Sequence, residues 1–272
     1  MNHRQLLSLY GLKWNPFSAE IPDEALISNT MIDNFLWRIE NLVLEGGFAL
    51  ITGEPGLGKS VVVRLLARHL QTIKDATIAE CSRPQSNIGD FYRELGSLFG
   101  IALNYNSRWK TFQLLREQWK AHIESTLVRP VLLVDEAQEM NPLVLSEIRL
   151  LSSMRFDSKI VLTVVLSGDG RLADKFRLPE LLPLGSRIRT RLTLEPYSKE
   201  HLLGMLTESL TRAGAPRLMT KELMNTLVEH ALGYPRVMNT LANEILLLGA
   251  KREVSLLDEQ LFFDVLPLKK RA

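Results

Sequence analysis

The sequence contains a single cysteine, Cys81, among its 272 residues. One cysteine cannot form a disulfide within the chain, which fits the reducing environment of a cytoplasm. We interpret Cys81 as a small buried apolar residue, the common role of a free cysteine. No apolar run approaches the roughly 18–20 residues that cross a bilayer, and Met1 to Leu12 lack the apolar stretch of a secretory signal. These absences predict a cytoplasmic protein without a membrane anchor.

A large excess of one charge is also missing. Lysine and arginine number 33 and aspartate and glutamate 31, which leaves a formal net charge of +2. Nearly balanced charge is typical of an ordinary solvated surface, and it permits a nucleic-acid partner without requiring one. The chain has no internal repeat or low-complexity tract. Its length allows one large domain, or a large and a small one, with a substantial core.

Apolar periodicity predicts alternating strands and helices over the first two-thirds of the chain. Runs typical of buried strands are 48–52, 76–81, 131–134, 160–166 and a shorter, alternating one at 190–194. Helical spacing is found at 30–45, 60–70, 88–99, 107–126 and 143–154. Strands separated by helices favour a doubly wound parallel sheet. We therefore predict an α/β fold with a five-stranded parallel sheet.

The pattern changes after Pro196, where only helical spacing remains. The predicted helices are 199–213, 220–232, 236–251 and 256–266. We place a domain boundary near Glu195 and Pro196. Residues 1–195 would form the α/β domain, and residues 196–272 a small all-helical domain.

A complete P-loop motif, G-x-x-x-x-G-K-[ST], follows the first predicted strand. It consists of Gly53, Glu54, Pro55, Gly56, Leu57, Gly58, Lys59 and Ser60, with Val61 next in the helix. Glycines let backbone N–H groups turn inward around phosphate oxygens, and the helix start adds its positive dipole end. Lys59 would reach the β- and γ-phosphates, and the Ser60 hydroxyl would bind Mg²⁺. A chance glycine-rich turn is the alternative, but the position between strand and helix predicts an ATP and Mg²⁺ site.

An acidic pair, Asp135 and Glu136, follows the strand 131–134. The carboxyl end of a buried parallel strand is where open α/β sheets bind ligands. Asp135 would orient Mg²⁺, and Glu136 would polarise the attacking water. Adjacent acids at a helix start also act as N-caps. The complete P-loop about 75 residues earlier favours the catalytic interpretation.

Two further signals are weaker. Ser167 follows the strand 160–166, where a polar residue would sense the γ-phosphate or simply form a turn. Arg187, Arg189 and Arg191 alternate, as on a solvated strand edge. Alternatively, one of them is an arginine finger for a neighbouring subunit's ATP. We favour Arg187, with Arg177 as the second choice.

The segment Gly233-Tyr234-Pro235-Arg236 begins a predicted helix. Proline in the first turn fits helix geometry, so a plain helix start is one interpretation. In the other, the guanidinium of Arg236 reaches back to the phosphates and couples the helical domain to the nucleotide.

Taken together, these motifs resemble the AAA+ ATPases of the ExeA/GspA-like group. That group includes DNA-transposition helper ATPases of the TniB, TnsC, MuB and IstB kind. The resemblance begins at Tyr10-Gly11-Leu12-Lys13-Trp14-Asn15-Pro16-Phe17 and continues through Gly47-Phe48, Asp135-Glu136-Ala137-Gln138 and Gly233-Tyr234-Pro235-Arg236. It implies a P-loop AAA+ core with a helical lid. It also implies that Asp135 and Glu136 form the Walker B pair, that Ser167 is sensor 1 and that Arg236 is sensor 2. The segment around Asn15, Pro16 and Phe17 would border the adenine.

The same resemblance implies a role. In the transposition helpers, ATP-bound subunits assemble on double-stranded DNA as rings or helical filaments, recruit or stimulate a transposase, and leave after hydrolysis. Secretion-type relatives carry a transmembrane segment after the ATPase, whereas this sequence ends at Ala272 without one. We therefore expect a DNA-binding transposition regulator. The alternatives are a secretion or assembly ATPase that acts on protein partners, and a nucleotide-gated scaffold with little turnover, which Glu136 disfavours.

DNA binding needs cationic residues that contact phosphates. The candidates are Arg83, Arg93, Arg108 and Lys110, with Tyr105 and Trp109 interleaved. Equally, Ser107 caps a helix whose Arg108 and Lys110 are solvated and whose Trp109 lies in the core. The basic tail Lys269-Lys270-Arg271 would hold a phosphate or a partner's acidic face, or be solvated like most termini.

Overall fold

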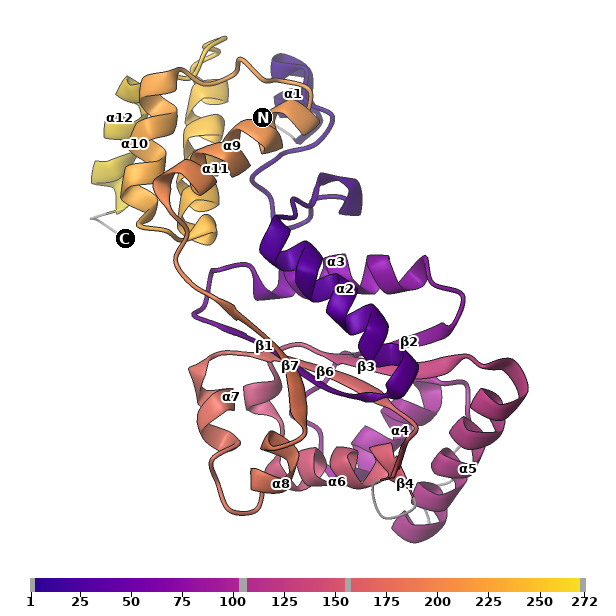
Figure 1. The fold of residues 1–272 in the computed structure, drawn as a ribbon. Helices are drawn as coiled ribbons and strands as arrows, with labels where there is room; N and C mark the ends of the chain where they lie inside the picture. Colours follow the sequence, from indigo (N-terminus) through magenta and orange to yellow (C-terminus); the bar gives the residue numbers. More distant parts are fainter. Residues whose placement is uncertain (1–2, 103–106, 155–157, 270–272) are drawn as a thin grey trace. The chain divides into compact units, whose positions relative to one another are not determined.

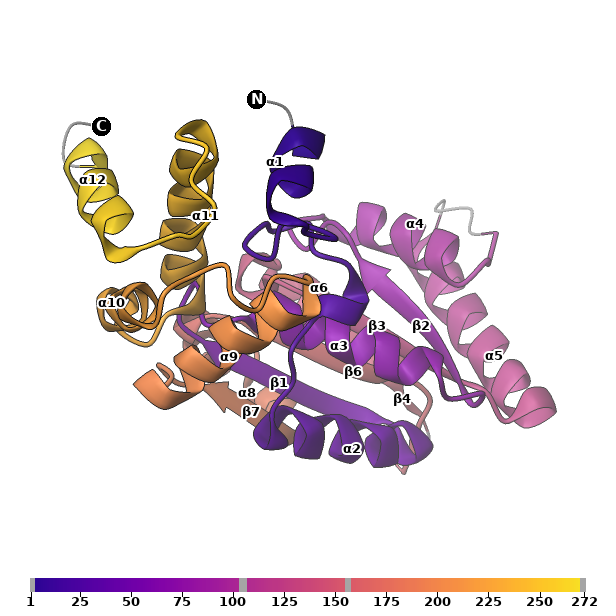
Figure 2. The ribbon, with the colours of Figure 1, turned by 90° about the horizontal axis from the view of Figure 1, so that it is seen from above.

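The computed structural model describes residues 3–102, 107–154 and 158–269 (Figures 1 and 2). The chain divides into an α/β unit, Ser28–Pro55 with Lys59–Leu194, and a helical unit, Met1–Ile27 with Gly56–Gly58 and Glu195–Ala272. The change of pattern at Pro196 predicts an α/β domain over residues 1–195, which includes the first 27 residues. They group instead with the helical unit, because their apolar side chains are buried among its helices.

The α/β unit is built on a parallel sheet. Among the described residues its strands are β1 (Gly47–Gly53), β2 (Ala76–Cys81), β3 (Arg129–Val134), β6 (Thr163–Gly168) and β7 (Ile188–Leu194). They lie in the order β2-β3-β6-β1-β7, and all neighbouring pairs are parallel. The predicted five-stranded parallel sheet is confirmed. All five strands therefore end at the same edge.

Helices cover both faces of this sheet (Figure 1). Helices α2 (Thr30–Glu45) and α3 (Lys59–Gln71) contact one face. The other face carries α4 (Ile88–Leu98), α5 (Arg108–Thr126), α6 (Pro142–Ser152), α7 (Gly170–Lys175) and α8 (Leu182–Gly185). Helix α2 matches its predicted bounds, since Asn29 caps its start and Gly46, at φ 77°, ends it.

The region after α6 differs from the prediction. Helix α6 ends at Ser152, and the short strands β4 (Ser153–Met154) and β5 (Lys159–Ile160) pair antiparallel. Strand β6 consequently begins at Thr163, three residues later than predicted. The short helices α7 and α8 were not predicted, because each offers too few turns for a periodic apolar pattern.

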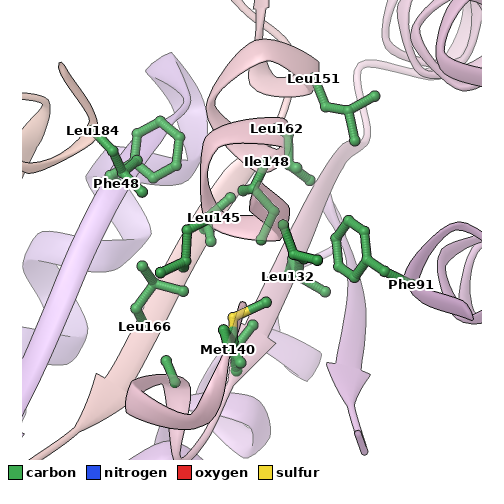
Figure 3. Close-up of a cluster of buried hydrophobic side chains, with 14 of the residues drawn as sticks. Phe48, Phe91, Leu132, Met140, Leu145, Ile148, Leu151, Leu162, Leu166 and Leu184 are labelled. Carbon is green, nitrogen blue, oxygen red and sulfur yellow. The ribbon is translucent and has the colours of Figure 1, made fainter. Parts of the chain in front are cut away.

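The main core of the α/β unit lies between the sheet and helices α4 to α8. Phe48, Leu132 and Leu166 project from three strands toward Ile148 and neighbouring leucines of α6 (Figure 3). Each of these side chains is at most 1% exposed. Because both faces of the sheet are covered, its central strands are apolar throughout rather than alternating.

The helical unit contains helices from both ends of the chain. They are α1 (His3–Tyr10), the 3₁₀ turn η1 (Asp23–Ala25), α9 (Lys199–Arg212), α10 (Lys221–Ala231), α11 (Pro235–Lys251) and α12 (Glu259–Lys269). Leu6, Tyr10 and Phe17 share one apolar core with α9 to α12. No helix within the described ranges is long and apolar enough to span a membrane.

Candidate active site

The P-loop connects β1 to α3 and folds around its own lysine. The Nζ atom of Lys59 donates to the carbonyl oxygens of Gly53 at 2.9 Å and Glu54 at 3.1 Å, and Lys59 is only 6% exposed. Gly58 has a φ of 98°, which a residue with a Cβ rarely adopts. At Gly53, a Cβ would stand 2.9 Å from the carbonyl oxygen of Leu194. The glycines of this loop are thus required by its backbone path and close packing.

The predicted acidic and sensor residues meet at the same edge of the sheet. Strand β6 lies between β1 and β3, with Ile51 beside Ser167 and Val134 beside Leu166. Asp135 directly follows Val134. The Ser167 hydroxyl, which is fully buried, donates to Asp135 Oδ1 at 2.8 Å. Sheet register therefore brings the end of the P-loop strand, the acidic pair and Ser167 together.

The oxygens at this edge suit Mg²⁺ bound with a nucleotide. The Ser60 hydroxyl is exposed in the first turn of α3, and the Asp135 carboxylate is half-buried. Mg²⁺ is typically held by one or two protein oxygens together with substrate phosphates and water. Within the described ranges, no three histidine, cysteine, aspartate or glutamate side chains gather as an all-protein metal site. The Ser60 hydroxyl and the Asp135 carboxylate are oxygens of the kind that fits Mg²⁺ bound together with phosphates.

Glu136 lies next to Asp135 in an unusual backbone conformation. Its φ of 51° and ψ of 37° place it in the left-handed region, which is uncommon for a residue with a side chain and recurs at functional sites. The exposed carboxylate accepts a hydrogen bond from Nε2 of Gln138, which is only 4% exposed. In the sequence, Gln138 ends the motif Asp135-Glu136-Ala137-Gln138, which by itself predicts no role for this residue. Its position two residues after the acidic pair was the signal in the sequence, whereas its burial is seen only in the structure.

A charged pair lies directly after β6, called the sensor strand here because it contains Ser167, the predicted sensor residue. Asp169 caps α7 by accepting from the backbone N–H of Arg171, and the two side chains form a salt bridge. The hydrogen bond from Arg171 holds the pKa of the Asp169 carboxyl below its ordinary value, with a smaller contribution from the charge of Lys59. A negative charge therefore persists beside this edge well below neutral pH.

The arginines before and within β7 occupy different places. Arg187 immediately precedes β7, at the amino-terminal edge of the sheet, whereas the P-loop lies at the carboxyl edge. A seven-residue strand spans about 20 Å, so Arg187 is remote from the P-loop of its own subunit. Arg189 and Arg191 project from the exposed face of β7. Arg177 is exposed and pairs with Asp174 at 3.1 Å.

Several predicted nucleotide contacts belong to the helical unit, among them Arg236, Pro16 and Phe17. The backbone N–H of Arg236 donates to the carbonyl of Gly56 at 3.2 Å, and both residues are part of that unit. Pro16 and Phe17 are buried in its core, where Asn15 donates to Asn243 at 2.7 Å. The roles predicted for these residues toward the nucleotide stay predictions.

Two of the three proposed DNA-contacting arginines, Arg93 and Arg108, already have protein partners. Arg93 pairs with Asp90 on α4. Arg108 donates through Nε at 3.0 Å and through Nη2 to Glu147, whose side chain is 2% exposed and also accepts from the Tyr92 hydroxyl at 2.5 Å. Arg108 is thus neither simply solvated nor a free phosphate ligand. It neutralises a buried carboxylate.

The other residues predicted around the DNA-binding candidates differ in their surroundings. Ser107 caps α5, as predicted. The alternative that places Trp109 in the core is wrong, because its side chain is 64% exposed and stacks on Phe112, with ring centroids 5.9 Å apart. Arg83 and Lys110 are exposed. Tyr105, Lys270 and Arg271 lie outside the described residues.

The single cysteine is not a reactive thiol. Cys81 ends β2, half-buried against the core, and its Sγ atom donates to Glu94 at 3.6 Å. Burial, followed by the negative charge of Glu94, raises the pKa of the thiol to about 12. The thiolate that would act as a nucleophile is therefore scarce at neutral pH.

Comparison with protein families identifies an AAA domain at residues 43–176. General secretion pathway protein A of Aeromonas hydrophila is 33% identical over 246 residues, which cover 89% of this chain and 44% of the relative. The chain thus spans less than half the length of that protein.

Solved structures show the same architecture. The Aeropyrum pernix ORC2 protein, in ADPNP-ADP complexes, matches with a TM-score of 0.71 at 14% identity over 91% of this chain and 70% of its own. Drosophila ORC bound to DNA matches with a TM-score of 0.68 at 18% identity over 96% of this chain and 65% of its own. At these identities the likeness establishes the fold alone.

Proposed function

We propose that this chain, an AAA+ ATPase by its AAA domain, is an ATP-driven switch that assembles on double-stranded DNA and regulates transposition. The observation that carries the enzymatic part is the bond between Ser167 and Asp135. That bond joins the sensor strand to the acidic pair, at the edge of the sheet where the P-loop strand ends.

Binding would replace bonds that the P-loop now makes to itself. Lys59 would exchange its carbonyl partners, Gly53 and Glu54, for β- and γ-phosphate oxygens. The start of α3 adds N–H groups and a positive dipole end. Ser60 and Asp135 would hold Mg²⁺, which supplies charge neutralisation at the phosphates when bound.

Hydrolysis needs a base that orients water. We assign this role to Glu136, because it directly follows Asp135 and its carboxylate is exposed. General-base catalysis of this kind contributes typically about 10²–10⁴-fold to a rate. Ser167 would report the γ-phosphate to Asp135 through their shared hydrogen bond.

The site would be completed by a second copy of the chain. Arg187 lies at the opposite edge of the sheet from its own P-loop, so it would serve as a finger only in a neighbour's site. We therefore propose a nucleotide-dependent homo-oligomer, either a ring or a helical filament. Arg236 would act as sensor 2 and Phe17 would border the adenine.

Double-stranded DNA is the partner we favour. The motif set resembles the transposition helpers, and one structure with the same fold is that of a DNA-bound assembly. Arg83 and Lys110 remain exposed cationic candidates, with Arg93 sharing its charge with Asp90. A transposase would then be the protein that the assembly recruits or stimulates.

A protein-directed ATPase is the second candidate. Identity of 33% to a general secretion pathway protein favours it, and the guanidinium of Arg108 already pairs with Glu147. This reading predicts nucleotide-dependent oligomers that are indifferent to DNA.

One experiment separates the two candidates. A labelled random-sequence duplex is titrated with the protein in ATP, ADP or no nucleotide, at two salt concentrations. The DNA proposal predicts tight binding with ATP only, weakened by salt because bound cations are released. A Lys59→Ala variant serves as the control and should not bind in any nucleotide. Absence of binding by the wild-type protein in every state would overturn the DNA proposal and favour a protein partner.

A further inference from the structure

Gln138 connects the proposed catalytic base to the sensor strand. It lies in the 3₁₀ turn Ala137–Glu139 and is almost fully buried. Its Nε2 donates to the Glu136 carboxylate, and its Oε1 accepts from the backbone N–H of Asp169 at 3.3 Å. One amide side chain therefore uses its donor on the base and its acceptor on the segment that follows Ser167.

The surroundings of Gln138 leave it little freedom. Oε1 lies against Gly168, where a Cβ would stand only 2.6 Å away, so the absence of a side chain makes room for the amide. From α7, Lys175 Nζ donates to the carbonyl of Gln138 and, at 2.8 Å, to that of Met140. The turn is thus held by the helix that begins directly after the sensor strand.

We propose that Gln138 is a positioning residue that orients Glu136 and couples it to the Ser167–Asp169 segment. This inference rests on the proposed role of Glu136 as the base. A shift of that segment when Ser167 meets a γ-phosphate moves the Asp169 N–H, and Gln138 transmits the shift to the Glu136 carboxylate. Hydrolysis then depends on an intact amide, while nucleotide affinity, set by the P-loop, does not.

Two substitutions test this role. Gln138→Ala removes both hydrogen bonds. Gln138→Glu keeps the shape and the acceptor for Asp169 but faces Glu136 with a second carboxylate, which repels it. We expect kcat for phosphate release to fall about tenfold or more in both variants, because misplacing a reacting group by about 1 Å can cost 10²-fold. The dissociation constant of a fluorescent ATP analogue should stay within about threefold of wild type.

Glu139→Gln is the matched control. Glu139 occupies the same turn, and its carboxylate forms a salt bridge with the exposed side chain of Arg171, so Glu139→Gln should leave kcat unchanged. Urea unfolding of all variants establishes that the fold is retained. If Gln138→Ala lowers affinity and kcat together, or lowers kcat no more than Glu139→Gln, the positioning role is overturned.

A double-mutant cycle separates this inference from the proposal beneath it. In a Glu136→Gln background, adding Gln138→Ala should change the residual rate by less than twofold, since Gln138 acts through Glu136. A further tenfold loss there would show that Gln138 acts elsewhere and would refute its role alone. If Glu136→Gln by itself leaves kcat unchanged, the assignment of the base fails, and the inference with it.

Discussion

The Arg108→Ala substitution tests whether Arg108 stabilises the fold or contacts DNA. Its guanidinium neutralises the carboxylate of Glu147, which is buried between α5, α4 and α6 and shares its oxygen Oε1 with the hydroxyl of Tyr92. Arg108→Ala therefore leaves a buried carboxylate with its hydroxyl donor but without its counter-charge. We expect the free energy of unfolding to fall.

The size of the loss follows from the burial of the pair. Breaking a fully buried ion pair costs about 3–5 kcal/mol. The Arg108 side chain is 55% exposed, so water replaces part of its charge, and we expect a loss of about 2–3 kcal/mol. For a chain of this size, such a loss lowers the melting temperature by about 4–10 °C.

Urea unfolding, followed by tryptophan fluorescence, measures this loss. Lys110→Ala is the control, since Lys110 is exposed two residues along the same helix and should unfold within about 0.5 kcal/mol of wild type. Adding Glu147→Gln to Arg108→Ala should restore part of the stability, because the neutral amide needs no counter-charge. An Arg108→Ala protein that unfolds like wild type yet loses DNA affinity would refute the reasoning.

Three further predictions concern other parts of the chain. Gly168→Ala places a Cβ 2.6 Å from Gln138 Oε1, so kcat for phosphate release should fall and the free energy of unfolding should drop by about 1–3 kcal/mol. An unchanged kcat would contradict the packing argument. Mixing Arg187→Ala with Glu136→Gln should restore phosphate release above that of either variant alone, and no recovery would count against a finger acting between subunits. Burial raises the pKa of Cys81 to about 12, so the unfolded chain loses this proton first and the native state loses stability between about pH 8.5 and 12. Urea midpoints of wild type and Cys81→Ala should therefore diverge over that range, and parallel curves would contradict the pKa.

Local signals predicted the elements that carry the chemistry. Helix α2 was predicted at its observed bounds, because its apolar side chains recur at helical spacing and Gly46 ends it. The P-loop and the acidic pair are contiguous in sequence, so a short motif is enough to find them. Ser167 was predicted as a γ-phosphate sensor from its place at the end of a strand, whereas its bond to Asp135 follows from the strand order, which the sequence does not reveal.

Features that depend on contacts between distant segments could not be predicted from the sequence. The exposure of Trp109 and the pairing of Arg108 with Glu147 are set by how α5 packs against α6, which no local pattern encodes. Likewise, the first 27 residues carry apolar side chains that either unit could bury. The bonds of Gln138 join two loops whose approach follows only from the sheet register.

Phosphate release by wild type and Glu136→Gln, with ATP affinity measured in both, tests the account most directly. The account predicts that the substitution lowers kcat by about 100-fold or more while the dissociation constant for ATP stays nearly unchanged. Equal turnover by the two proteins, with ATP bound equally well, would contradict the assignment of Glu136 as the base at the carboxyl edge of the sheet.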